Sequence, residues 1–117
     1  MKNRGAPAEA LAAAFLRGRG MKILARNYRC RFGEIDLVAE SGRTLVFVEV
    51  RARTSEAFGG PAASITAAKR RRVVAAARHY LAVNGERAAR FDVVLVRGDP
   101  PQLEWISDAF GEDNTRR

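Results

Sequence analysis

The chain has 117 residues, of which 47% are apolar, and its 21 lysines and arginines outweigh 13 aspartates and glutamates to give a net charge of +8. This length and composition predict one globular domain with a buried core and argue against a second domain. A single cysteine, Cys30, excludes an internal disulfide, and with only one histidine, His79, a Cys/His zinc site is excluded too. The longest apolar run, residues 10–16, is too short to cross a bilayer, so we expect a cytoplasmic protein without a membrane partner.

The positive charge indicates an anionic partner. Basic proteins favour polyanions, most commonly nucleic acid, because each neutralised phosphate releases condensed counterions. The same charge also fits a ribosome-associated protein, a membrane-surface protein or a solvated basic surface. Composition alone does not choose among these alternatives.

Helix and strand signals alternate along the chain. In chain order they predict a helix at 8–18, a strand at 21–32, a hairpin at 33–51, a loop at 52–63, a helix from Ser64 or Thr66 to about Val83, strands at 91–96 and 102–106, and a disordered tail from Gly111. This α-β-β-β-α-β-β order indicates a single α/β domain with a mixed sheet. We expect the domain to occupy residues 1–110 and the tail residues 111–117.

The register of the hairpin at 33–51 decides which of its side chains meet. A turn built around Ser-Gly places Ala39 opposite Thr44. The pairs that follow are Val38 with Leu45, Leu37 with Val46, Asp36 with Phe47, Ile35 with Val48 and Glu34 with Glu49. Because successive side chains of a strand point to opposite faces, one face is then wholly apolar and the other carries every carboxylate of the two strands.

The acidic face of the hairpin needs a neutralising partner. Glu34 directly opposite Glu49 is a destabilising arrangement, and Asp36 is the diagonal neighbour of Glu49, with Cα atoms roughly 7–8 Å apart. A hard divalent cation such as Mg²⁺ would neutralise these oxygens, and salt bridges to Arg51 on the same face would do so without a metal. Because Phe47 shares this face, we expect a helix to cover it and to bury the acids at its rim.

Several runs of the chain resemble the YraN-like family of uncharacterised bacterial proteins. The shared runs are RNYRCR followed by GEIDLVA, then LVFVEVR, FGGP, a basic helix that ends near HYL, RFDVV and LEWI. The similarity covers nearly the whole chain. That family is similar to archaeal Holliday junction resolvases and belongs with the restriction-endonuclease-like superfamily, whose signature is an Asp followed on the next strand by Glu-x-Lys.

The resemblance implies a restriction-endonuclease-like fold and a metal-dependent nuclease site. Asp36 and Glu49 match the acidic positions, Glu9 matches a further metal ligand on the first helix, and Mg²⁺ is the implied cofactor, for which Mn²⁺ can substitute. Arg51 stands where the motif has lysine. Arginine can stabilise charge on a phosphate but cannot lose a proton, so it cannot act as a base. Both a working nuclease and a catalytically silent DNA-binding module therefore stay open.

A cluster of cations opens the second predicted helix. We expect Lys69, Arg70, Arg71 and Arg72, together with Arg53, to contact the phosphate backbone of a nucleic acid. The resulting hypothesis is a metal-dependent nuclease that acts on DNA, branched DNA by analogy with resolvases. The alternatives are a non-catalytic nucleic-acid-binding protein and a protein-interaction module, and the analogy leaves a homodimer open.

Overall fold

The computed structural model describes residues 5–53 and 65–111 of the chain. Its elements are α1 (Gly5–Gly18), β1 (Lys22–Cys30), β2 (Gly33–Ser41), β3 (Thr44–Arg53), α2 (Ala67–Asn84), β4 (Ala89–Arg97) and β5 (Gln102–Phe110). The predicted order of helices and strands is therefore confirmed. Most of the loop predicted at 52–63 and nearly all of the predicted tail lie outside the described residues. Neither described helix is long and apolar enough to cross a membrane.

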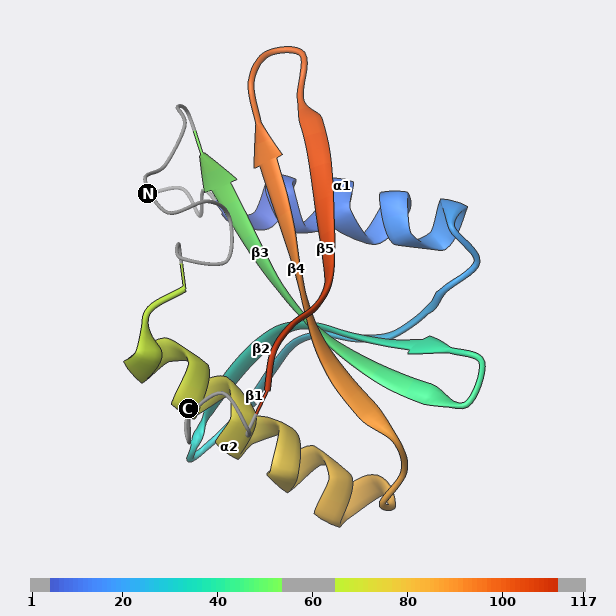
Figure 1. Ribbon diagram of the computed structural model, residues 1–117, viewed down its shortest axis with the longest axis vertical. Coiled ribbons are helices and arrows are strands. Elements are labelled where there is room, and N and C mark those ends of the chain that lie inside the picture. The colour runs from blue at the N-terminus through green and yellow to red at the C-terminus, as the bar shows by residue number, and fades with distance from the viewer. Residues whose placement is uncertain (1–4, 54–64, 112–117) are drawn as a thin grey trace.

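The five strands form one mixed sheet in the order β1-β2-β3-β4-β5 (Figure 1). Only β3 and β4 are parallel, and the connection between them contains α2, as a parallel pair requires a crossover. α1 packs on one face of the sheet and α2 on the other. The chain thus has a restriction-endonuclease-like α/β fold in a single domain, as predicted.

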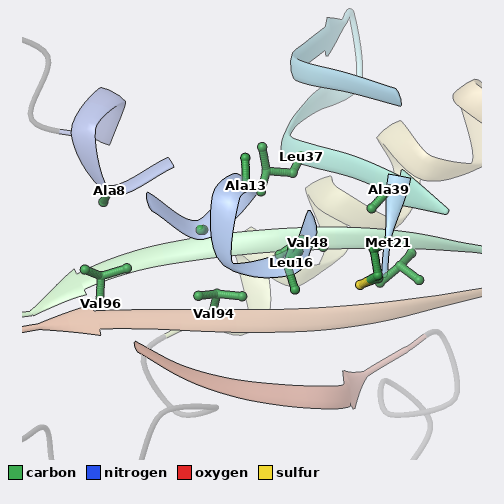
Figure 2. Packing of buried hydrophobic residues seen from close by; sticks show 11 residues of the cluster. Ala8, Ala13, Leu16, Met21, Leu37, Ala39, Val48, Val94 and Val96 are labelled. Carbon is green, nitrogen blue, oxygen red and sulfur yellow. The ribbon is translucent and has the colours of Figure 1, made fainter. Parts of the chain in front are cut away.

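α1 covers one face of the sheet with a stripe of small side chains. Its buried residues recur at helical spacing, so they lie on one side of the helix. They are Ala8, Ala12, Ala13 and Leu16. They contact the apolar side chains of β2, β3 and β4, among which Leu37, Val48 and Val94 are labelled in Figure 2. Small side chains allow a helix to approach a sheet closely, and Glu9 of α1 lies near enough to Asp36 of β2 to interact with it.

α2 covers the opposite face. Thr66 caps the helix by accepting a hydrogen bond from the Lys69 backbone N–H at 3.1 Å, and Gly85 ends it with φ 110°. Tyr80 of α2 packs edge-on against Phe47 of β3, with the ring centroids 5.8 Å apart. The predicted cap and the predicted helical cover are both confirmed. The cap also fixes the first turn of α2 and hence the position of Lys69.

The register of the β2–β3 hairpin differs from the prediction by two residues. Ser41 pairs with Thr44 and Ala39 with Val46, so Ala39 does not face Thr44. The turn consists of Gly42 and Arg43, because Gly42 with φ 60° supplies the left-handed conformation that a two-residue hairpin turn needs at its first position. A shift of two preserves which face each side chain occupies, so the division into faces survives the error over most of the hairpin.

Ile35 is the exception to that division. It packs under α2, whereas Leu37 packs under α1, so the alternation breaks at Asp36. On the neighbouring strand, Asn27 has φ 53°, in the left-handed region that asparagine tolerates better than most residues. Asn27 lies opposite the break, since the residues on either side of it pair with Leu37 and Ile35. The prediction of a wholly apolar face is therefore wrong at Ile35, because the strands are distorted around Asp36.

Candidate functional site

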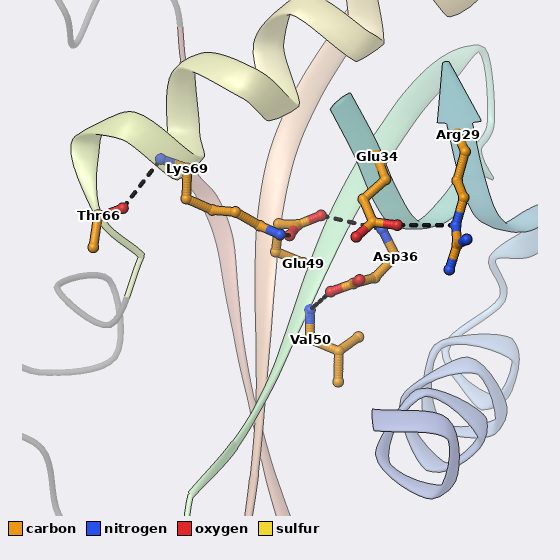
Figure 3. A network of polar contacts seen from close by, with 7 residues as sticks. All are labelled: Arg29, Glu34, Asp36, Glu49, Val50, Thr66 and Lys69. Carbon is orange, nitrogen blue, oxygen red and sulfur yellow. Dashed lines mark hydrogen bonds and ion pairs between the residues drawn. The ribbon is translucent and has the colours of Figure 1, made fainter. Parts of the chain in front are cut away.

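Asp36 and Glu49 lie directly across from each other where the β2–β3 ladder ends. The last paired residues are Leu37 and Val48, and the side chains of the two acids take over the backbone bonding beyond them. The Asp36 N–H donates to Glu49 Oε2 at 3.1 Å, and the Val50 N–H donates to Asp36 Oδ2 at 2.8 Å (Figure 3). Each carboxylate is thus fixed by the backbone of the other strand, and the predicted diagonal relation is replaced by a closer one.

Glu49 is buried with an incomplete set of partners. Its residue exposure is 0%, and Oε1 has no hydrogen-bond partner among the described residues. Lys69 Nζ lies 3.5 Å from this oxygen, which makes an ion pair without a directed hydrogen bond. A buried carboxylate oxygen without hydrogen bonds is costly, so this atom is the exception to be explained.

Burial sets the protonation of the pair. Loss of solvent, followed by the negative charge of Asp36, raises the pKa of Glu49 to about 8 from an ordinary value of 4.5, against the opposing positive charge of Lys69. Burial also raises the pKa of Asp36, although the hydrogen bond from Val50 works against it. The two groups titrate as a pair. At neutral pH the pair therefore retains a proton, which a bound cation would displace.

Glu9 lies on α1, which packs on the face of the sheet opposite α2. Partial burial and the charge of Asp36 raise its pKa, and a hydrogen bond to the Asn27 side chain lowers it. Glu9 on α1 and Asp36 on β2 are thus close enough to interact. The structure places this predicted ligand beside Asp36, next to the distorted part of β1.

Two cations flank the carboxylates. Arg51, two residues beyond Glu49 on β3, is close enough to Asp36 to lower its pKa, and Arg51 Nε is buried without a hydrogen-bond partner among the described residues. Lys69 approaches Glu49 from α2. The lysine that the motif would place at position 51 is thus absent from β3, and a lysine of α2 lies against the motif glutamate instead.

Glu34 does not face Glu49. It pairs with Arg29 of β1, whose Nε lies 3.0 Å from Glu34 Oε1. The predicted repulsion between Glu34 and Glu49 is therefore wrong, because the two-residue register shift moves Glu34 further along the hairpin. Its charge is neutralised by an arginine of the neighbouring strand, and both side chains are about half or more exposed.

The predicted nucleic-acid contacts on α2 point in different directions, because successive helical residues turn by about 100°. Lys69 and Arg72 line a cavity with the β1–β2 turn, whereas the Arg70 guanidinium donates to the Ile65 carbonyl at 2.8 Å. Arg71 is exposed and does not line that cavity. Arg53 ends β3, but its side chain lies outside the described residues.

The carboxylate pair fits a hard cation in part. Within residues 5–53 and 65–111, no three His, Cys, Asp or Glu side chains converge as a ready metal-binding group. Asp36 and Glu49 do present oxygen ligands side by side, and the unpartnered Oε1 of Glu49 is the kind of atom that a cation would satisfy. The predicted set of Glu9, Asp36 and Glu49 is thus two adjacent ligands with a third acid next to Asp36.

Sequence reasoning missed two contributors. Asn27 received no role, although an asparagine in the middle of a β-forming run was a detectable irregularity. Lys69 was assigned to the phosphate backbone rather than to Glu49. Glu49 and Lys69 are far apart in the sequence, so their contact depends on the packing of α2 on the sheet and cannot be predicted from local patterns.

Comparison with known proteins places the chain among its relatives. The model of the uncharacterised protein family UPF0102 matches residues 8–96. The chain belongs to this family. The YraN-like resemblance is confirmed by this membership, and the matched residues include Glu9, Asp36, Glu49 and Lys69.

Individual relatives match over almost the full chain. A UPF0102 protein of Nitrosomonas europaea is 54% identical over 112 residues, which cover 94% of this chain and 95% of the relative. One of Cupriavidus taiwanensis is 56% identical over 112 residues, with 94% and 84% covered. One of Methylobacillus flagellatus is 53% identical over 111 residues, with 94% and 98% covered. These names state no activity, so any function must be argued from the site.

Proposed function

We propose that this chain is a cytoplasmic nuclease that hydrolyses phosphodiester bonds of DNA with the help of Mg²⁺ or Mn²⁺. One observation carries the proposal: the buried Glu49 carboxylate, with an unpartnered oxygen, is held against Asp36 by the backbone of the opposite strand. Such an arrangement destabilises the metal-free fold, and residues that violate local stability in this way are typical of functional sites.

The residues of the site divide into ligands and cations. Asp36 and Glu49 would hold the metal, and Glu9 would complete its ligand set from α1. A divalent cation at such a site supplies charge neutralisation and a hydroxide-like nucleophile at neutral pH. The backbone N–H groups that bond the carboxylates keep the ligand oxygens in place before substrate binds.

Lys69 and Arg51 have separate parts in the proposal. Arg51 stays protonated and stabilises negative charge on the phosphate. Lys69 Nζ, 3.5 Å from Glu49, takes the position of the motif lysine, where its ammonium orients the attacking water and donates to a phosphate oxygen. Substitution of the motif lysine by arginine on β3 is then compatible with catalysis, because an amine is supplied from α2.

The test is cleavage of a panel of labelled DNA substrates, comprising a single strand, a duplex and a four-way junction of matched sequence, with and without Mg²⁺. Glu49→Gln and Asp36→Asn should each reduce metal-dependent cleavage by at least about 100-fold while DNA affinity in EDTA changes little. Glu40→Gln is the matched control, since it removes an acid of the same hairpin that pairs with Arg87, away from the carboxylate pair. Undiminished cleavage by Glu49→Gln would contradict the proposal.

The alternative function is DNA binding without cleavage. Two observations favour it: Arg51 stands where the nuclease motif has lysine, and the described residues contain no ready group of three metal ligands. In this alternative the same fold binds DNA without cutting it. DNA affinity would then fall steeply with salt, and no substrate of the panel would be cleaved with any divalent metal. The preference for branched DNA and the homodimer follow from the resemblance to resolvases. Junction-against-duplex affinity and the mass of the chain in solution test them separately.

A further inference from the structure

A basic cavity lies beside the carboxylate pair, between the β1–β2 turn and α2. We call it the turn-helix pocket, and its volume is about 260 Å³. Its lining residues are Arg29, Cys30, Gly33, Glu34, Lys69 and Arg72. Three of these are cations and one is an anion, so the pocket carries a net positive charge. Lys69 lines this pocket and also belongs to the Glu49 site, since its extended side chain reaches Glu49 (Figure 3).

The wall of the pocket is set by a close backbone approach. A Cβ added at Gly33 would lie 2.7 Å from the Arg72 carbonyl oxygen, so the turn and the helix touch at this point. Arg72 is exposed, and the ion pair between Arg29 and Glu34 is largely solvated and hence weak. Both guanidinium groups are therefore available to an anion that enters the pocket.

An exposed aromatic side chain stands at the tip of the same turn. Phe32 is 46% exposed, which is high for a large apolar residue. Its ring centroid lies 5.8 Å from that of His79 on α2, and the Arg31 guanidinium carbon lies 5.2 Å from the ring centroid. His79 is in turn held by a 2.6 Å hydrogen bond between its Nδ1 and the Tyr28 hydroxyl. The Phe32 ring is thus held in place by His79 and Arg31 while nearly half of the residue stays exposed to solvent.

We propose that this surface binds an unpaired nucleotide of a DNA strand, with its base stacked on Phe32 and its phosphate in the turn-helix pocket. The inference rests on the proposed function, because it concerns the strand whose backbone passes Glu49. A basic groove beside an aromatic platform is the arrangement that binds single strands, since every base has a face that can stack and every nucleotide a phosphate that can be neutralised. Lys69, shared by both sites, would couple the bound nucleotide to the carboxylate pair.

The experiment measures affinity by fluorescence anisotropy in EDTA, so that no cleavage occurs. The probes are a single strand, a blunt duplex of the same sequence and an abasic strand of the same length. Phe32→Leu, which keeps an apolar side chain without a ring, should weaken binding of the single strand about tenfold and leave the abasic strand within twofold. Leu11→Ala, an exposed apolar residue of α1, is the control and should change neither affinity.

The pocket is tested by charge removal. Arg72→Ala should weaken the single strand and the abasic strand alike, by about five- to tenfold, and reduce the salt slope by about 0.7. Arg17→Ala is the control for loss of one positive charge, because this exposed arginine of α1 does not line the pocket. Thermal melting of each variant verifies that it is folded.

The outcomes separate this inference from the proposed function. Equal losses in Arg17→Ala and Arg72→Ala, unchanged single-strand affinity in Phe32→Leu, or no binding of any strand by the unaltered chain would each overturn it. If the chain cleaves DNA but Phe32→Leu binds the single strand normally, the nucleotide-binding inference is wrong and the proposed nuclease function is supported. If the chain and its variants show the expected affinities but no DNA is cleaved, the nucleotide-binding inference is supported and the proposed nuclease function is wrong.

Discussion

Two buried acids in this protein have opposite surroundings. Asp92 and Glu49 both have 0% exposure, and they lie on adjacent parallel strands. Asp92 accepts hydrogen bonds from Arg90 Nε at 3.0 Å and NH2 at 3.3 Å, from Trp105 Nε1 at 2.8 Å and from the Asp108 N–H at 2.9 Å. Glu49 accepts one backbone hydrogen bond through Oε2, and its Oε1 has only the ion pair with Lys69 Nζ at 3.5 Å.

The number of hydrogen-bond donors separates the two buried carboxylates. Four donors satisfy the Asp92 carboxylate, two of them on β5, so Asp92 links β4 to β5 and requires no further ligand. Glu49 lacks such donors, and burial raises its pKa to about 8. A complete hydrogen-bond set indicates a structural acid, and an incomplete one indicates a site with a missing partner.

The largest expected effect is on stability, and it contrasts the two acids directly. Asp92→Asn should lower the free energy of unfolding at pH 7 by roughly 3 kcal/mol, because Arg90 loses its buried counter-charge and one donor loses its acceptor. Glu49→Gln should change it by less than about 1 kcal/mol or raise it, because the neutral amide resembles the protonated form of Glu49. Urea denaturation measures both, and equal losses would break the comparison.

A second prediction concerns pH. The pKa of Glu49 is raised in the folded state to about 8 from an ordinary value of 4.5, so the folded chain binds the proton more tightly than the unfolded chain between these values. Stability is therefore greatest below pH 4.5 as far as this group is concerned, and it is lost as the pH rises toward 8. Relative to Glu49→Gln, the unaltered chain should lose about 2 kcal/mol between pH 6 and 8.

Urea titrations at several pH values check this, with the difference between the two proteins isolating position 49. The raised pKa of Asp36 acts in the same direction. Addition of Mg²⁺ should flatten the loss, because a cation stabilises the ionised pair. A difference that is independent of pH would show that Glu49 is charged in the folded metal-free chain.

The smallest expected effect concerns the cation opposite Glu49. Lys69→Met should cost about 1 kcal/mol at pH 9, where Glu49 is ionised, and clearly less at pH 6, where the pair retains a proton. Arg71→Met is the control on the same helix. Thermal unfolding at the two pH values checks it, and an equal cost at both would mean that Lys69 acts through packing alone.

Much of the fold could be predicted from local patterns. The order of the elements, the Thr66 cap and the cover of α2 over Phe47 follow from helix-capping chemistry and from the alternation of apolar residues. The hairpin register was wrong by two residues because a short run offers two turns of similar quality, and the left-handed Gly42 decides between them. β5 also runs on to Phe110, past Asp108 with φ 56°, whereas the predicted strand ends at residue 106.

The site was predicted in part for the same reason. Asp36, Glu49 and Arg51 lie near one another, as predicted. A two-residue error in the hairpin register does not move a side chain to the other face of the sheet, so it left this part of the prediction intact. The motif resemblance, rather than any local pattern, pointed to Glu9. Neither the pairing of Glu34 with Arg29 nor the αL conformation of Asn27 was foreseen, since both depend on the strand that lies beside β2.

Short-range sequence patterns are sufficient to predict the α/β architecture, the positive charge and the position of Asp36 and Glu49 on one face of the hairpin. These follow from short-range periodicity and composition, which act between neighbours in the chain. Only the tertiary structure decided that Glu49 is buried without sufficient donors while Asp92 has four, and that Lys69 meets Glu49. Burial and ion pairing of this kind depend on which distant segments pack together, and that information lies in the packing of α2 on the sheet.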